Sequence, residues 1–142
     1  MTPKEVVEQF WKTMQTNDFY AASQWFSDDY ELDWPVSSEK IIGAENFAAL
    51  NSNYPANGTW QFTIHRIVAE GNQVVTDVSV TDGVVEARAI TFSTVTDGKI
   101  TKQVEYWPEP YKAPAWRKQW VVPLNKSLQG TLNRSAANVK RS

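Results

Sequence analysis

The sequence predicts an α+β domain in which helices come first and an antiparallel sheet follows. Apolar residues recur at helical spacing as far as about residue 53, and from residue 60 to residue 107 they alternate with polar residues as in half-buried strands. The pairs Asp82-Gly83 and Asp97-Gly98 stand between alternating runs, which is the strongest short-range sign of a hairpin. Helices followed by strands are typical of a fold in which the helices gather on one face of a sheet.

Three short helices are predicted before the main sheet. Thr2 can cap the first helix, with Pro3 at its first position and Glu5 as the reciprocal partner of a capping box. A second helix is expected over residues 18–29 and a third over residues 43–53. The first helix presents one apolar stripe, which consists of Val6, Val7, Phe10, Trp11 and Met14.

Five strands are predicted, one before the third helix and four after it. The early strand covers residues 30–34 and ends at Pro35, because proline has no N–H to give to a sheet. In the first of the later strands, one face is expected to carry Trp60, Phe62, Ile64 and Val68. The four later strands are expected over residues 60–68, 74–80, 85–95 and 100–107.

Charge divides the chain into two parts. Residues 1–111 contain seven basic and all sixteen acidic side chains, a net charge of −9, whereas residues 112–142 contain seven basic and no acidic side chains, a net charge of +7. We therefore predict a main domain over residues 1–111 and a basic C-terminal extension over residues 112–142 that packs on the domain or on its dimer partner. The basic residues of the extension form no dense cluster, which does not favour nucleic acid as a partner.

Composition excludes several classes of protein and site. The chain has no cysteine, which excludes a disulfide framework and a cysteine-based zinc site. His65 is the only histidine, which excludes a multi-histidine metal site, and neither a metal nor another cofactor is expected. No apolar run approaches the roughly 20 residues that span a bilayer, so no membrane partner is expected. The first residues do not resemble a secretory leader, and we predict a cytoplasmic protein.

Four stretches of the sequence resemble a known superfamily. Residues 26–32, 34–36, 43–47 and 96–100 are similar to the nuclear transport factor 2-like superfamily, in particular to its SnoaL-like and ketosteroid isomerase-like members. The resemblance covers about residues 3–107. It implies a cone-shaped curved antiparallel sheet wrapped around three N-terminal helices, with a pocket for a small molecule. It also implies a homodimer, which we expect to form through the outer face of the sheet and the extension.

The resemblance does not carry over the best-known chemistry of the superfamily. The tyrosine, the base and the buried acid of ketosteroid isomerases fall on Phe10, Trp34 and Ile90. None of these side chains exchanges a proton usefully, since even the indole of tryptophan is only a donor. The arginine of the related epoxide hydrolases falls on Arg88, but the aspartate expected two residues later is Ile90. Steroid isomerisation by that mechanism is therefore not predicted, and the epoxide hydrolase set is incomplete.

Three other residues are candidates for catalysis. The resemblance implies that Glu105 lines the cavity, where aromatic surroundings would raise its pKa toward useful values and make it the leading acid/base; the alternative places it on the outer face beside Lys102. Arg88 would bind a carboxylate or polarise a carbonyl; the alternative is a structural salt bridge with Asp77. His65 has a pKa near neutrality and is the third candidate; the alternative is a surface or interface histidine.

The resemblance, together with the aromatic composition, implies a protein with an apolar pocket for a small apolar or aromatic molecule. One hypothesis is an enzyme of the isomerase, cyclase or hydrolase type in which Glu105 is the acid/base. The alternatives are a binding protein without catalysis and a dimeric scaffold. The residues expected to line the pocket are Phe10, Met14, Trp34, Phe47, Trp60, Ile90, Phe92, Gln103 and Trp107.

Overall fold

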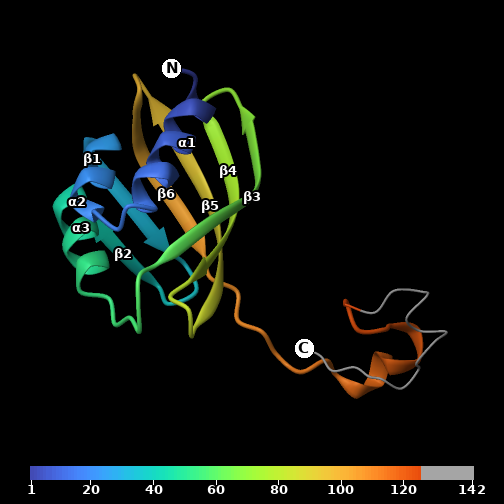
Figure 1. Cartoon of the computed structure of the whole chain (residues 1–142). Coiled ribbons are helices and arrows are strands. Elements are labelled where there is room, and N and C mark those ends of the chain that lie inside the picture. Colours follow the sequence, from blue (N-terminus) through green and yellow to red (C-terminus); the bar gives the residue numbers. More distant parts are fainter. Residues whose placement is uncertain (126–142) are drawn as a thin grey trace. The chain divides into compact units, whose positions relative to one another are not determined.

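The computed structural model describes residues 1–125, and the chain divides into two compact units (Figure 1). The first unit is Met1–Glu109 and the second begins at Pro110, two residues before the predicted start of the extension. In the second unit a short 3₁₀ helix, η2, spans Ala115–Trp120. Part of the predicted extension, residues 126–142, lies outside the described residues, and its packing on the domain or a partner stays a prediction. Within residues 1–125, no helix is both long enough and apolar enough to cross a membrane.

The first helix, α1 (Pro3–Met14), begins with the predicted capping box. The Glu5 N–H donates to Thr2 Oγ1 at 3.1 Å, and the Thr2 N–H donates to Glu5 Oε1 at 2.8 Å. The helix expected over residues 18–29 is shorter than predicted. Helix α2 covers Phe19–Ala22, and a 3₁₀ turn, η1, covers Ser23–Trp25. The chain is already extended at Phe26, where the first strand begins.

The strands form one six-stranded curved sheet that does not close into a barrel, in the order β2-β1-β6-β5-β4-β3. Strands β1 and β6 are parallel, and every other neighbouring pair is antiparallel. The predicted α+β fold is therefore confirmed, although β2 was not predicted and the sheet contains one parallel pair. The strands are β1 (Phe26–Trp34), β2 (Glu39–Ile42), β3 (Gln61–Glu70), β4 (Gln73–Thr81), β5 (Glu86–Thr96) and β6 (Lys99–Tyr106).

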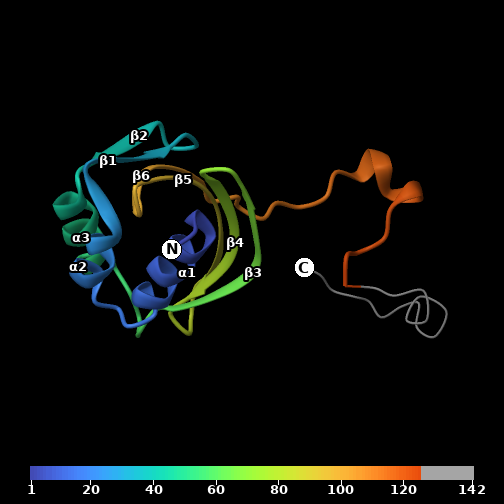
Figure 2. The ribbon, with the colours of Figure 1, turned by 90° about the horizontal axis from the view of Figure 1, so that it is seen from above.

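Helix α1 lies on the concave side of the sheet (Figure 2). Its apolar side chains belong to the hydrophobic core. Its predicted stripe, from Val6 to Met14, is buried, and it packs against β3, β4, β5 and β6. Helix α3 (Ala44–Ser52) packs against α2, β1 and β2. The ring of Phe26 stacks on that of Tyr30, with the centroids 3.6 Å apart, and Phe47 meets both rings edge-on. Aromatic rings therefore pack against one another in this part of the core.

Irregularities in the strands decide which side chains face α1. The pairing of β3 with β4 shifts by one residue between Ile64 and Arg66, so the alternation reverses at His65. Ile67 consequently packs against the core, and Val68 is 63% exposed, which makes the prediction that Val68 shares the core face wrong. A similar shift between Thr94 and Val95 changes the register of β5 on β6.

Candidate functional site

A row of polar side chains crosses the inner face of the sheet at the height of Glu105. The parallel register of β1 on β6 brings Trp34 alongside Glu105, and Thr91 of β5 is its antiparallel partner on the other side. Thr76 of β4 follows next to Thr91. The indole of Trp11, on α1, donates to Thr76 Oγ1 at 3.3 Å. Four strands and one helix therefore contribute to a polar row inside an otherwise apolar core.

Glu105 is the centre of this row and is held by three neutral donors. Its Oε1 accepts hydrogen bonds from the indole Nε1 of Trp34, at 3.0 Å, and from that of Trp107, at 3.1 Å. Its Oε2 accepts one from Thr91 Oγ1, at 2.6 Å. The residue is 7% exposed, so the alternative that placed Glu105 on the outer face is wrong. Both lone-pair directions of Oε1 are used, whereas Oε2 keeps one acceptor direction free.

Burial and hydrogen bonding act on Glu105 in opposite directions. Removal from water disfavours the charged form and raises the pKa of this carboxyl above its ordinary value of 4.5. The hydrogen bonds from Thr91, Trp34 and Trp107 favour the charged form and partly offset that rise. In residues 1–125 no lysine, arginine or histidine forms a salt bridge with Glu105. Its charge is therefore stabilised only by neutral groups.

A second buried polar chain lies beside the first. The hydroxyl of Tyr30 donates to Gln103 Oε1 at 2.5 Å, and Gln103 Nε2 donates to Ser93 Oγ at 3.1 Å. Burial, with a smaller contribution from the charge of Glu105, raises the pKa of Tyr30 well above 10, so its phenol stays neutral. Gln103, predicted to line the pocket, is 1% exposed and faces the interior. Its amide is occupied in positioning Tyr30 and Ser93.

The other predicted lining residues fall into three groups. Phe10, Met14 and Phe47 are buried among the core side chains. Trp34, Trp60 and Trp107 are half-buried and pack against the same core. Ile90 and Phe92 were predicted to line the pocket, but they occupy the opposite face of β5 from Thr91 and Ser93, because neighbouring residues of a strand alternate in direction. Phe92 is 44% exposed.

Arg88 and His65 also lie away from Glu105. Arg88 donates to both carboxylate oxygens of Asp77, and Arg66 donates to Asp77 Oδ2. Asp77 alternates with the buried, inward-facing Thr76 and Val78, so this cluster is on the outer face of the sheet. The two arginines, Arg88 most strongly, lower the pKa of Asp77 from 3.8 to about 2. The structural alternative for Arg88 is therefore the observed arrangement.

The exposed His65 ring lies 2.6 Å from Ser79 Oγ, measured from Nε2. Ser79 is paired with Arg88 across β4 and β5, on the face that carries Asp77. The prediction that Arg88 and His65 assist Glu105 is consequently not supported by the geometry. Among residues 1–125, no three His, Asp or Glu side chains come together in a way that would hold a metal ion.

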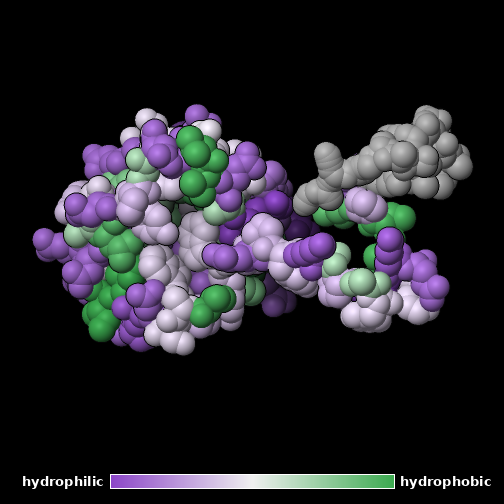
Figure 3. All heavy atoms as spheres, turned by 90° about the horizontal axis from the view of Figure 1, so that it is seen from below, coloured by the Kyte–Doolittle hydropathy of each residue, from purple (hydrophilic) through white to green (hydrophobic). Residues whose placement is uncertain are grey.

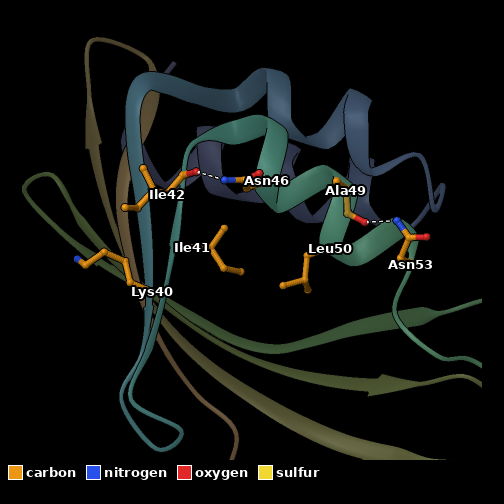
Figure 4. A pocket seen from close by; sticks show the side chains of 7 residues that line it. All are labelled: Lys40, Ile41, Ile42, Asn46, Ala49, Leu50 and Asn53. Carbon is orange, nitrogen blue, oxygen red and sulfur yellow. Dashed lines mark hydrogen bonds between the residues drawn. The ribbon is translucent and has the colours of Figure 1, made fainter.

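A separate open groove runs between β2 and α3 (Figure 4). It has a volume of about 510 Å³ and is lined by Lys40, Ile41, Ile42, Asn46, Ala49, Leu50 and Asn53. Ile41 and Leu50 point into it, while the amides of Asn46 and Asn53 donate to backbone carbonyls. Apolar side chains also form separate patches between hydrophilic ones on the surface seen in Figure 3. Sequence reasoning missed this groove because it missed β2.

Sequence reasoning also missed the residues that hold Glu105. Trp34 was predicted as pocket lining and as the position of the isomerase base, Trp107 was predicted as pocket lining, and Thr91 was not predicted at all; none was expected to donate to Glu105. The alternation of small polar and apolar residues in β5 was the available signal, since Thr91 and Ser93 fall on the face of Ala89 and Val95. What these residues provide is a buried carboxyl in a fixed orientation, with one oxygen that can still exchange a proton.

Comparisons with known proteins agree with the fold. A family model of the SnoaL-like domain matches residues 7–103. The structure of an NTF-2 like protein of unknown function from Burkholderia xenovorans LB400 is 31% identical, with a TM-score of 0.72 over 86% of this chain and 94% of that chain. A candidate ketosteroid isomerase from Kribbella flavida DSM 17836 is 26% identical, with a TM-score of 0.78 over 87% of this chain and 91% of that chain. An LEH-like epoxide hydrolase of M. tuberculosis is 25% identical, with a TM-score of 0.62 over 75% of this chain and 82% of that chain. No curated protein matches the chain.

Proposed function

The chain belongs to the family of SnoaL-like domains, and from that premise we propose that it is an enzyme acting on a small apolar or aromatic molecule with Glu105 as its acid/base. The observation that carries the proposal is the buried Glu105 carboxyl, which two indoles and one hydroxyl hold in place with no cation to neutralise it among the described residues. The names of two relatives, a candidate ketosteroid isomerase and an epoxide hydrolase, support small-molecule chemistry.

The chemistry follows from the two oxygens of Glu105. Oε1 accepts two N–H donors and has no free direction, so the proton is exchanged at Oε2. Thr91 fixes the orientation of Oε2. A carboxyl whose pKa lies above its usual value is a stronger base than an exposed glutamate, and it is closer to the pKa that suits proton transfer near neutral pH. The half-buried rings of Trp34 and Trp107 border the site.

This mechanism differs from that of ketosteroid isomerases. The positions that correspond to their catalytic groups are Phe10, Trp34 and Ile90. Phe10 is packed in the core and Ile90 is on the outer face, so neither takes part at Glu105. Trp34 contributes as a donor to the carboxylate instead. The reaction class that fits is proton transfer by a single carboxyl, as in an isomerisation, cyclisation or elimination.

The test uses 5-nitrobenzisoxazole, an aromatic molecule whose isoxazole ring opens when a base removes the C–H proton of that ring, because a nitrile forms as the N–O bond breaks. The coloured phenolate product is followed by absorbance. General-base catalysis contributes roughly 10²–10⁴-fold to the rate of a reaction. After the background rate in buffer is subtracted, Glu105→Gln is therefore expected to react at least about tenfold more slowly than the wild type. Glu86→Gln removes an exposed carboxyl on β5 and is the matched control. Equal rates for the wild type and Glu105→Gln would overturn the proposal.

A second candidate function is ligand binding without catalysis. The observation that favours it is the number of donors on Glu105, which leave a single acceptor direction open to a ligand. In this case small aromatic ketones and alcohols bind and quench the tryptophan fluorescence of wild type and of Glu105→Gln alike. No variant then turns over 5-nitrobenzisoxazole. Turnover that depends on Glu105 would exclude this candidate.

We also propose that the chain forms a homodimer through the outer face of the sheet, with the extension adding to the interface. Phe92 and Tyr106 lie edge to face on this surface, with centroids 6.2 Å apart and exposed fractions of 44% and 39%. Exposed apolar clusters of this kind mark interaction surfaces. In sedimentation velocity, Phe92→Lys should shift dimer to monomer, and Val84→Lys, at an exposed turn, should not. If deletion of residues 112–142 leaves the dimer affinity unchanged, the extension does not contribute to the interface.

A cytoplasmic location stays a prediction.

A further inference from the structure

A buried carboxylate fastens the loop between α3 and β3 to the turn between β4 and β5. Asp82, in that turn, is 6% exposed. Its Oδ1 accepts the N–H groups of Val84 and Val85, at 2.9 and 2.8 Å, and so shapes the turn. Its Oδ2 accepts the backbone N–H of Asn57 at 2.8 Å and the side-chain Nδ2 of Asn57 at 3.2 Å. One side chain of the turn therefore holds both the main chain and the side chain of Asn57.

The donors around Asp82 keep its carboxylate charged. The backbone N–H of Asn57, followed by those of Val85 and Val84, lowers the pKa of Asp82 well below its ordinary value of 3.8. The negative charge is therefore present throughout the neutral pH range. A second negative charge at position 57 would be repelled by it.

Close packing of the same loop on the turn explains the glycine that follows Asn57. A Cβ on Gly58 would come within 2.8 Å of the backbone carbonyl oxygen of Asp82, so a larger residue would force the main chain apart. Asn57 and Gly58 are both exposed and lie outside the helices and strands. A glycine has no side chain to shield its nitrogen from the amide carbon of the preceding asparagine, and this makes the pair chemically labile.

We propose that Asn57 is a site of spontaneous deamidation and that the modification releases the loop from Asp82. The backbone nitrogen of Gly58 gives up its proton and attacks Cγ of Asn57. The bond from Cγ to Nδ2 breaks, Nδ2 takes up a proton and leaves as ammonia, and a five-membered succinimide remains. Water then opens the ring at either carbonyl to give aspartate or isoaspartate. The net reaction consumes one water and releases one ammonia, without oxidation or reduction.

Either product disrupts the contact with Asp82. In the aspartate product a carboxylate oxygen replaces the donor Nδ2, which lies 3.2 Å from Asp82 Oδ2. Two carboxylates at such a distance repel each other, and the pKa of one of them rises. In the isoaspartate product the main chain also gains one carbon atom, which displaces Gly58 from its place on the turn. This site is separate from Glu105 and does not depend on the proposed function.

The first test is a time course with the full chain in mildly alkaline buffer, followed by peptide mapping with mass spectrometry. Replacement of the amide NH₂ by OH adds about one mass unit. We expect the peptide with Asn57 to gain this mass, faster as the pH rises. Asn51 is the internal reference and should stay unmodified, because it lies within α3 and its Nδ2 donates to the Phe47 carbonyl at 2.9 Å. Absence of the mass gain at Asn57 would overturn the inference.

The second test concerns the protection that Asp82 gives. Its charge opposes the negative charge that develops during the attack, and its hydrogen bonds hold the amide of Asn57. Asp82→Ser keeps an oxygen acceptor for the turn and removes the charge, whereas Asp82→Asn would create a second Asn-Gly pair. We expect Asp82→Ser to deamidate at Asn57 at least about fivefold faster, the factor for two unit charges about 4 Å apart in water. Asp97→Ser, in the exposed turn before Gly98, is the matched control and should keep the wild-type rate. An unchanged rate in Asp82→Ser would overturn the part given to Asp82.

The third test measures the effect of the product on the fold. Asn57→Asp supplies the aspartate product in pure form, and its unfolding midpoint near neutral pH should lie about 4 °C or more below that of the wild type. Asp82 raises the pKa of the new carboxyl in the folded state, so the stability of the variant falls as the pH rises above about 3.9. Asn57→Ala loses the same donor without gaining a charge, and its difference from the wild type should not follow this pH dependence. Equal midpoints for Asn57→Asp and the wild type at every pH would overturn the release of the loop.

Discussion

At the scale of single residues, the ionisation of Glu105 gives a prediction about stability. Its pKa is raised in the folded state by burial, so between about pH 4.5 and that raised pKa the folded chain holds a proton that the unfolded chain has released. The free energy of unfolding therefore falls as pH rises through this interval. Glu105→Gln removes the effect, since an amide does not titrate.

We expect the stability of Glu105→Gln relative to wild type to increase with pH over this interval. Urea unfolding at a series of pH values from 4 to 8 measures the difference. A carboxyl pKa shift of one unit corresponds to about 1.4 kcal/mol, which this measurement resolves. Parallel stability curves for the two proteins would show that burial does not raise the pKa of Glu105.

The same residue shows what the sequence could predict about the site and what it could not. The resemblance to the superfamily implied that Glu105 faces the interior, the alternating strand left the outer face open as the alternative, and the structure buries the side chain. Its donors could not be predicted, because Trp34 is 71 positions away along the chain and meets Glu105 only through the parallel pairing of β1 with β6. That pairing leaves no local pattern in the sequence.

At the scale of elements, the bounds of the last three strands were predictable and strand register was not. The early strand, predicted over residues 30–34, was predicted too short, because it already begins at Phe26. Strands β4, β5 and β6 begin and end within a residue or so of the predicted positions, because alternation and Asp-Gly turns are local signals. The shift at His65 reverses the faces of β3 without any change in composition, which is why Val68 was placed on the wrong side. Strand β2 has only four residues, too few for a clear alternation.

The hydrogen bonds of Asn17 connect the end of α1 with the start of β3, and they lead to a prediction about stability. Asn17 Nδ2 donates to the Trp60 carbonyl at 2.8 Å, and the Trp60 N–H donates to Asn17 Oδ1 at 2.9 Å. The amide side chain thus forms the same pair of hydrogen bonds with Trp60 that a neighbouring strand would form. The φ of Asn17 is 65°, in the region that favours glycine and asparagine. Asn17→Gly keeps this backbone conformation and removes both hydrogen bonds to Trp60, together with a longer one from Nδ2 to the Gln15 carbonyl at 3.3 Å.

We expect Asn17→Gly to lower the free energy of unfolding by roughly 1–3 kcal/mol, which is the usual range for two lost hydrogen bonds. Asn17→Ala should lose a further ~1 kcal/mol, because alanine also disfavours the positive φ. Urea unfolding measures both. If Asn17→Gly is as stable as the wild type, the pairing with Trp60 does not contribute to stability.

At the scale of the whole molecule, the boundary at Glu109 separates the part that carries the core from the part that carries exposed aromatic side chains. Every residue of the described hydrophobic core lies within Met1–Glu109, and so do Glu105 and its three donors. In the second unit, Trp116 is 73% exposed and Trp120 is 70% exposed. Folding of the first unit should therefore not require the second.

We predict that a chain ending at Glu109 unfolds cooperatively and that, at protein concentrations low enough for the full chain to be monomeric, its midpoint lies within about 3 °C of that of the full chain, since a loss of 1 kcal/mol shifts the midpoint of a domain this size by roughly 4–8 °C. Differential scanning calorimetry measures the midpoint. The same truncated chain should keep its Glu105-dependent turnover of 5-nitrobenzisoxazole, because the acid/base and its donors are all retained.

A large drop in the midpoint would instead show that the second unit stabilises the first. Measuring the drop at several protein concentrations then separates two explanations. A drop that does not depend on concentration indicates a contact within one chain, and a drop that lessens at high concentration indicates a contact between chains.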